Sequence, residues 1–151
     1  MNNFYTNNYP IINLYKKRSV KSEIVTQMIF GESFKILKKL KNWSKISILE
    51  DNYIGYVKNK NFSQNLIPTH KVFKLKAPIF KKSNKKKIIN YLPFGAKIKI
   101  DRKYNNFYKF QKYLIEKKNL KPLNYIEKNI ANKIKIFRNV KYFWGGKTYK
   151  G

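Results

Sequence analysis

The sequence predicts a mainly β protein made of two small barrels in tandem, followed by one C-terminal α-helix. Three observations predict this fold class. Short apolar runs separated by polar breaks fill residues 9–62, the same spacing returns 64 residues later, and beyond residue 122 the apolar residues recur at helical intervals. Because 151 residues hold one ordinary domain or two small ones, the repeat favours two.

The first barrel is expected within residues 1–62. Apolar and polar residues alternate in Phe34-Lys35-Ile36 and in Ile46-Ser47-Ile48, as they do in half-buried strands. Polar breaks at 38–42 and 50–52 separate these runs. Several short strands at such close spacing are typical of a small barrel.

The second barrel is expected within residues 71–122, after a linker at 63–70, because the pattern of the first repeats there. Matching residues lie 64 positions apart: Phe30-Gly31 with Phe94-Gly95, Trp43 with Phe107, and Ile46 with Phe110. A glycine that enters a strand, followed at fixed distances by apolar and aromatic residues, is what a barrel core needs. Trp43 and Phe107 are therefore predicted to lie in the two cores.

A helix is expected to begin near Asn124, a residue type that caps helices, and to end at Arg138. Its apolar residues at helical spacing are Ile126, Ile130, Ile134 and Phe137. This helix opens the third predicted region, residues 123–151.

Composition excludes several classes of function. The sequence has no cysteine and one histidine, so we expect no disulfide, no metal site, no cofactor and no thiol nucleophile within it. Apolar runs stay far below the roughly 20 residues that cross a bilayer, and no secretory leader is evident, so the expected location is cytoplasmic.

The net charge of +28 predicts a polyanionic partner at first sight. All but three of the 35 basic residues are lysine, however, and they are scattered through every segment. Phosphate and base recognition usually favours arginine, so we interpret most of this charge as compositional bias and solvated surface. Nucleic-acid binding is the weakest of the functional alternatives.

The segment after the predicted helix, Tyr142-Phe143-Trp144-Gly145-Gly146 and then Gly151, resembles a signature of the NlpC-type (NlpC/P60) cysteine peptidases. In that family Tyr-x-Trp-Gly-Gly is followed by a short loop, a glycine, one further residue and then Asp-Cys-Ser-Gly. The resemblance implies that residues 123–151 are the truncated start of a papain-like catalytic domain. The catalytic cysteine and histidines would be absent, and no catalytic residue is expected in this sequence.

A second resemblance covers the first barrel, in the stretch from Glu23 to Glu32, at Trp43, and from Asp51 to Val57. It is similar to the dipeptidyl-peptidase VI branch, in which two SH3-like domains precede the catalytic one. This resemblance implies SH3-like barrels and cleavage of the γ-D-glutamyl to diamino-acid bond of murein peptides that carry a free N-terminal L-alanine.

The resemblance also implies a clamp for the free amine, formed by Glu23, Tyr53 and Tyr142, since a carboxylate and hydroxyls suit an ammonium. Glu32 lies close enough in the sequence to be the carboxylate instead, and this alternative stays open. The leading hypothesis is a substrate-recognition part whose catalytic half is missing or supplied in trans. The alternatives are a stand-alone module that binds wall peptides or an anionic polymer, and a nucleic-acid binder.

Overall fold

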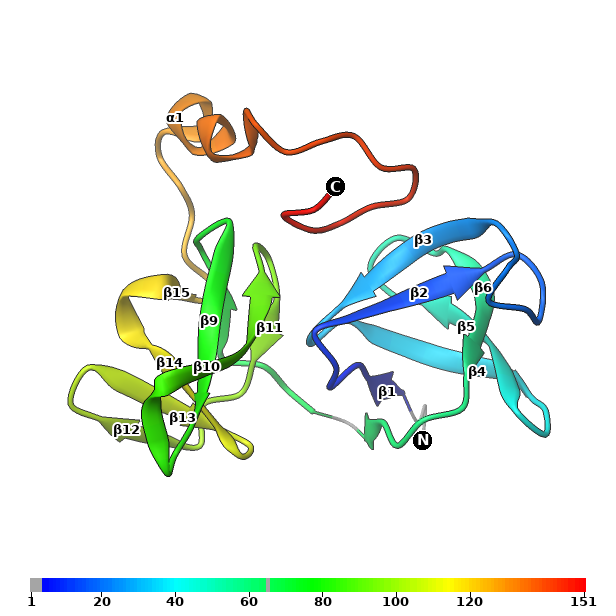
Figure 1. Ribbon diagram of the computed structural model, residues 1–151, viewed down its shortest axis with the longest axis horizontal. Helices are drawn as coiled ribbons and strands as arrows, with labels where there is room; N and C mark the ends of the chain where they lie inside the picture. Colours follow the sequence, from blue (N-terminus) through cyan, green and yellow to red (C-terminus); the bar gives the residue numbers. More distant parts are fainter. Residues whose placement is uncertain (1–3, 65) are drawn as a thin grey trace. The chain divides into compact units, whose positions relative to one another are not determined.

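The computed structural model describes residues 4–64 and 66–151, without the side chains of residues 84–86. The first residues of the predicted first barrel and one residue of the predicted linker lie outside these ranges. The chain forms two compact units, one of residues 1–66 with 142–147 and 151, the other of residues 67–141 with 148–150. Each is a small antiparallel β structure, which confirms the predicted fold class (Figure 1).

The first unit is one seven-stranded antiparallel sheet in the order β3-β2-β6-β5-β4-β1-β7, curled around a core. Its strands are β1 (Tyr5–Thr6), β2 (Ile11–Tyr15), β3 (Ile24–Ile29), β4 (Ser33–Lys39), β5 (Trp43–Ile48), β6 (Ile54–Lys58) and β7 (Ser63–Gln64). Every second residue of β5 is buried, as the alternating sequence predicts. Leu14 and Ile46 are fully buried in this core, and truncating either to alanine would cost about 2–5 kcal/mol.

The second unit repeats this order in two pieces, β10-β9-β14-β13-β12 and β11-β8-β15. Its strands are β8 (His70–Val72), β9 (Lys76–Lys81), β10 (Asn84–Pro93), β11 (Lys97–Ile98), β12 (Arg102–Tyr104), β13 (Phe107–Phe110), β14 (Tyr113–Glu116) and β15 (Leu120–Pro122), with the 3₁₀ turn η1 (Lys117–Asn119). The order matches if β11 and β12 together take the place of β4. The sheet of the second unit divides where that strand is interrupted at residues 99–101.

The 64-residue repeat is visible in the backbone. Gly31 and Gly95 have φ values of 85° and 82°, a region that only glycine adopts at little cost. The amide of Glu32 donates to the carbonyl of Ile29, and the amide of Ala96 donates to that of Pro93, both at 3.2 Å. The same turn therefore enters β4 in one unit and β11 in the other.

The repeat breaks after Phe110. In the second unit Phe110 pairs with Tyr113 across a two-residue turn, whereas in the first unit the last pair is Ser47 with Ile54. The loop between β5 and β6 is thus longer than its counterpart. It carries Glu50, Asp51 and Tyr53, which have no equivalents in the second barrel.

The helix is shorter than predicted, and its predicted start at Asn124 is wrong. The structure has α1 at Ile130–Ile134, followed by the 3₁₀ turn η2 at Lys135–Phe137. The cap is Asn129, whose side-chain oxygen accepts the amide of Asn132 at 3.0 Å. Upstream, the amide of Tyr125 bonds the carbonyl of Pro122 in a turn, so the chain is not helical there.

Trp43 and Phe107, which the spacing predicts to be core residues, are half-buried. Each packs edge-on against an aromatic ring of the neighbouring part of its own barrel, Trp43 on Tyr15 at 5.8 Å and Phe107 on Phe80 at 5.9 Å. The two positions are equivalent, as predicted, but they lie at the margin of the cores.

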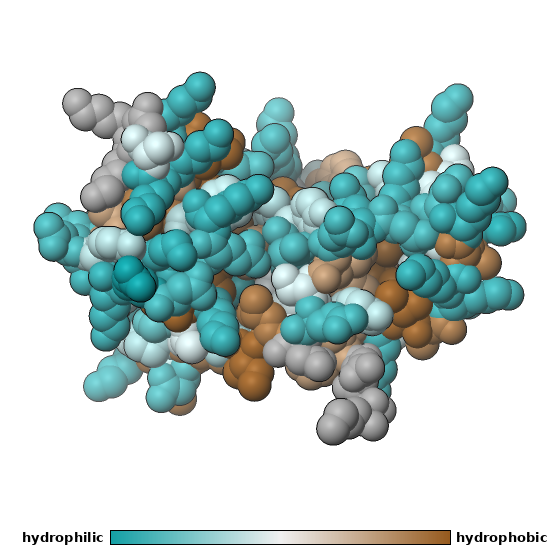
Figure 2. Space-filling view, turned by 90° about the horizontal axis from the view of Figure 1, so that it is seen from below, coloured by the Kyte–Doolittle hydropathy of each residue, from teal (hydrophilic) through white to brown (hydrophobic). Residues whose placement is uncertain are grey.

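No helix among the described residues is long and apolar enough to span a bilayer. Hydrophilic residues cover most of the face in Figure 2, with hydrophobic residues in small groups between them. This distribution agrees with a lysine-rich surface that is largely solvated.

Candidate functional site on the first barrel

Residues 143–147, called here the Trp-Gly-Gly segment, are hydrogen-bonded to strand β3 of the first barrel. Gln27 forms these hydrogen bonds. The Gln27 amide donates to the carbonyl of Gly145 at 2.8 Å, and the Lys147 amide donates to the Gln27 side-chain oxygen at 3.0 Å. The nitrogen of the same side chain bonds Oδ1 of Asn13 on β2 at 3.1 Å, which sets the amide orientation. Gln27 therefore holds residues 145–147 through both its backbone and its side chain.

Gly145 is required by this close approach. Its φ is +69°, and a Cβ at this position would lie 2.9 Å from the carbonyl oxygen of Val25 and 3.0 Å from Cα of Thr26. Both neighbours are backbone atoms of β3, which cannot move aside cheaply. The first glycine of the pair thus lets the segment lie directly against the strand.

Lys147 anchors the segment through its ammonium group, which pairs with two carboxylates of the first barrel. Nζ lies 3.0 Å from Oε1 of Glu32 and also pairs with Asp51. The Glu32 side chain is only 9% exposed, and its other oxygen accepts the amide of Ile29 at 2.7 Å. Such a buried carboxylate is costly unless it is paired, so the ion pair and the docking of the segment depend on each other.

The protonation of these groups follows from burial and charge. Burial raises the pKa of the Glu32 carboxyl above its usual value, although the Lys147 ammonium and the Ile29 amide oppose the rise. For Lys147, burial alone would lower the pKa, but the hydrogen bonds and charges of Asp51 and Glu32 outweigh it. The pKa of Lys147 is therefore raised, and the ammonium stays charged at neutral pH.

The second barrel forms the equivalent turn without an acid, and there Pro93, which has no amide hydrogen, takes the place of Ile29. The residue equivalent to Glu32 in the second unit is Ala96, which is fully buried in the same turn. Asp51 lies in the loop that the second barrel lacks. The two carboxylates that hold Lys147 are thus additions specific to the first barrel.

A hollow of about 570 Å³ opens beside the docked segment. It is lined by Ser22, Glu23 and Ile24 at the start of β3 and by Phe143 and Trp144. The Glu23 carboxylate forms an exposed ion pair with the Lys16 ammonium at 2.9 Å, so this carboxylate already binds a cation. The hollow combines one carboxylate with two aromatic rings, a set that suits an ammonium group next to an apolar group.

The residues predicted to form the amine clamp are only partly brought together. Glu23 lines the hollow, whereas Tyr53, 48% exposed, and Tyr142, 85% exposed, are not among its lining residues. Tyr53 follows Asp51 in the β5–β6 loop and donates its amide to that carboxylate at 3.2 Å. Glu32, the alternative carboxylate, is engaged by Lys147 and Ile29.

Three residues that organise this site were not singled out by sequence reasoning, namely Gln27, Asp51 and Lys147. Lys147 directly follows the Gly-Gly pair, and Gln27 and Asp51 lie within the stretches that carry the resemblance. A polar residue in an otherwise apolar strand, such as Gln27 beside Met28 and Ile29, was the available signal.

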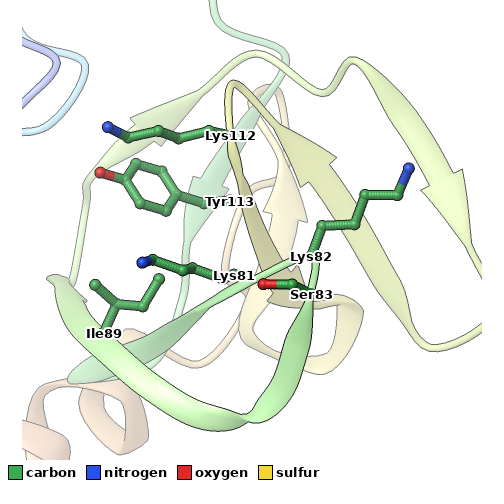
Figure 3. A pocket seen from close by; sticks show the side chains of 6 residues that line it. All are labelled: Lys81, Lys82, Ser83, Ile89, Lys112 and Tyr113. Atoms are coloured by element: carbon green, nitrogen blue, oxygen red, sulfur yellow. The ribbon is translucent and has the colours of Figure 1, made fainter.

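The second barrel carries a cationic hollow of about 770 Å³, lined by Lys81, Lys82, Ser83, Ile89, Lys112 and Tyr113. Figure 3 shows the side chains of Lys112, Tyr113 and Lys81 stacked in a row and pointing the same way, while Lys82 points away from them. Among the described side chains, no carboxylate, arginine or tryptophan lines this hollow. Among the described residues, no cluster of three or more histidines, cysteines or acids could hold a metal ion.

The fold and site define a protein of two SH3-like barrels in tandem, with a hollow beside the docked segment on the first barrel. Residues 14–62 match the family model for the bacterial dipeptidyl-peptidase SH3 domain, so the first barrel is similar to that kind of domain. A search of curated proteins found no significant match.

Among solved structures, the chain is similar to an NlpC/P60 family protein from Bacillus cereus ATCC 10987, with a TM-score of 0.78 and 14% identity. The alignment covers 98% of this chain and 68% of that one, and it shows that the two share a fold over this length. NlpC2 from Trichomonas vaginalis aligns over 95% of this chain and 58% of that one at 16% identity, but its TM-score is only 0.34.

Proposed function

We propose that this chain is the substrate-recognition part of a murein-peptide γ-D-glutamyl-diamino acid endopeptidase of the dipeptidyl-peptidase VI branch. The single observation that carries the proposal is the hollow that Glu23 shares with Phe143 and Trp144 of the docked segment. A match to a dipeptidyl-peptidase SH3 domain over residues 14–62 supports the same substrate class.

The proposed partner is a murein-derived peptide with a free N-terminal L-alanine. Its ammonium replaces Lys16 at Glu23, because both members of this ion pair are exposed and exchange with solvent at little cost. The alanine methyl group contacts the aromatic side of the hollow. Tyr53 and Tyr142 keep their proposed roles, in which their hydroxyl oxygens accept hydrogen bonds from the ammonium of the bound peptide.

Glu23 is preferred to Glu32 as the recognition carboxylate. Glu32 is buried and already holds the Lys147 ammonium, so a substrate amine would have to break that ion pair. Glu23 lies in the hollow and meets solvent. We therefore assign amine recognition to Glu23 and attachment of the 143–147 segment to Glu32.

The proposal assigns recognition, not bond cleavage, to these residues. Cysteine-peptidase chemistry needs a thiolate and a histidine that activates it, and the sequence has no cysteine. A catalytic half in trans would supply both groups.

Calorimetric titration of the full chain with L-Ala-γ-D-Glu, and with its N-acetylated form, tests the proposal. We expect saturable binding of the free amine, weakened about tenfold or more by acetylation or by Glu23→Gln, since each removes one charge-assisted contact. Glu116→Gln, which removes an acid of the second barrel paired with Lys118, is the matched control and should leave binding unchanged. Equal affinity for the acetylated peptide would contradict the proposal.

A further inference from the structure

A second hollow on the first barrel, of about 500 Å³, lies between the turn that starts at Lys17 and the turn that precedes β5. Its lining includes three cations, two small polar residues and one indole: Lys17, Arg18, Lys41, Ser19, Asn42 and Trp43. This volume lies within the range of sites for small ligands. The proposed peptide site uses none of these six residues.

Both turns are held in place by side-chain hydrogen bonds. In the first, Ser22 accepts the amide of Lys17 at 2.9 Å. In the second, the side-chain nitrogen of Asn59 donates to the carbonyls of Leu40 at 2.8 Å and Lys41 at 3.2 Å. The hydroxyl of Ser44 donates to the side-chain oxygen of Asn59 at 2.7 Å and so orients this side chain. A site that is ordered before binding loses less conformational entropy when a ligand arrives.

The indole of Trp43 is not explained by packing. Its edge-on contact with Tyr15 is reproduced in the second barrel by Phe107 on Phe80, with interplanar angles of 87° and 89°. A phenyl ring therefore suffices for the fold at this position. The larger ring of Trp43 contributes to the hollow, where it offers a flat apolar surface.

The charge of the hollow has one sign. Lys17, Arg18 and Lys41 line it, and no carboxylate is found among its described lining residues. Arg18 is one of only three arginines in the sequence, and its planar guanidinium pairs with phosphate or carboxylate through two hydrogen bonds. Ser19 and Asn42 supply neutral partners of the kind that sugar hydroxyl groups need.

We propose that this hollow binds an anionic sugar, with its phosphate or carboxylate on Arg18 and Lys41 and its ring on the indole of Trp43. Cations, a flat apolar surface and neutral hydrogen-bonding groups then each have a counterpart in the ligand. The inference is independent of the peptide site, because it rests on other residues and another ligand.

The test is a titration of the ¹⁵N-labelled full chain with glucose 1-phosphate, glucuronate and glucose, repeated at two salt concentrations. We expect the two anionic sugars to shift the amides of 17–19 and 40–43 and the indole NH of Trp43 saturably. Which anion binds more tightly distinguishes phosphate from carboxylate recognition. Glucose alone should shift nothing at the same concentrations.

Arg18→Gln and Trp43→Phe should each weaken binding about tenfold, the effect of losing roughly 1.4 kcal/mol of contact. Phenylalanine is chosen because Phe107 shows that it preserves the packing. Lys82→Gln and Lys112→Gln, in the cationic hollow of the second barrel, are matched controls that lower the net charge equally. Equal weakening by these controls would show non-specific attraction to a cationic protein and overturn the proposal. Tighter binding of adenosine monophosphate at the same residues would overturn the assignment to sugars.

Discussion

Nζ of Lys147 lies 3.0 Å from the buried carboxylate of Glu32, although the two residues are 115 positions apart in the sequence. With Asp51 and Gln27, this pair attaches the Trp-Gly-Gly segment to the first barrel and so creates one side of the hollow at Glu23. The integrity of the candidate site therefore depends on an ion pair that has no counterpart in the second barrel.

Lys147→Met should lower the free energy of unfolding of the first unit by about 2 kcal/mol, because it leaves the Glu32 carboxylate buried without its cation. Urea unfolding followed by tryptophan fluorescence measures this, since both tryptophans, Trp43 and Trp144, belong to the first unit. Lys38→Met, at an exposed position on β4, is the control. A loss no larger than that of the control would show that the ion pair does not stabilise the unit.

Glu32→Ala should leave the first barrel folded, because Ala96 fits the equivalent turn of the second unit. The barrel should be less stable, since the Ile29 amide loses its acceptor. The docked segment should loosen, since the ammonium group of Lys147 then pairs only with the carboxylate of Asp51. Hydrogen exchange of the Gln27 amide, which donates to Gly145, measures the loosening, and the amide of Met28 in the core reports on the barrel. Unfolding of the whole barrel would refute the view that the main role of Glu32 is to attach the segment.

Gly145→Ala should also detach the segment, by steric conflict rather than loss of charge. A Cβ would meet backbone atoms of β3 at 2.9–3.0 Å, at a φ of +69°. We expect fast exchange of the Gln27 and Lys147 amides, which form the two hydrogen bonds between the strand and the segment. Lys141→Ala, at an exposed position just before the segment, should leave both signals unchanged; unchanged signals in Gly145→Ala itself would contradict the observed packing.

The raised pKa of Glu32 predicts a pH dependence with a definite sign. The folded state holds a proton on Glu32 more tightly than the unfolded state, whose pKa is near 4.5, so folding takes up protons between the two values. The stability of the wild type relative to Glu32→Gln should therefore fall as pH rises from about 4.5 through the folded-state pKa, and then level off. Urea unfolding at several pH values measures it, and a difference that grows with pH would contradict the assignment.

Gly31→Ala and Gly95→Ala should each destabilise their own barrel by about 1 kcal/mol or more, because an L-residue is strained at φ values of 85° and 82°. Hydrogen exchange at Met28 and Leu92, equivalent core residues of the two units, separates the effects. If one substitution destabilised and the other did not, the two turns would not be equivalent.

Much of the fold could be predicted because strand periodicity and glycine positions are local signals. Phe34 and Ile98, 64 residues apart, are both fully buried, as their spacing predicts. The predictions from the sequence were wrong where one local pattern is compatible with two different structures. Trp43 lies at the margin of its core rather than inside it. The helix begins at Ile130 with Asn129 as its cap, and not near Asn124, because the chain forms a turn at Tyr125.

Two barrels with repeated cores could be predicted from the residues alone, because alternation is a pattern of neighbouring residues and the repeat has a constant spacing of 64 residues. It also indicated Glu23 and the Trp-Gly-Gly segment as parts of a site. The contacts that attach the Trp-Gly-Gly segment to the barrel beside Glu23 are seen only in the folded chain. The contacts of Lys147 with Gln27, Glu32 and Asp51 span 96–120 residues, and no periodic pattern records a pairing between side chains so far apart in the sequence.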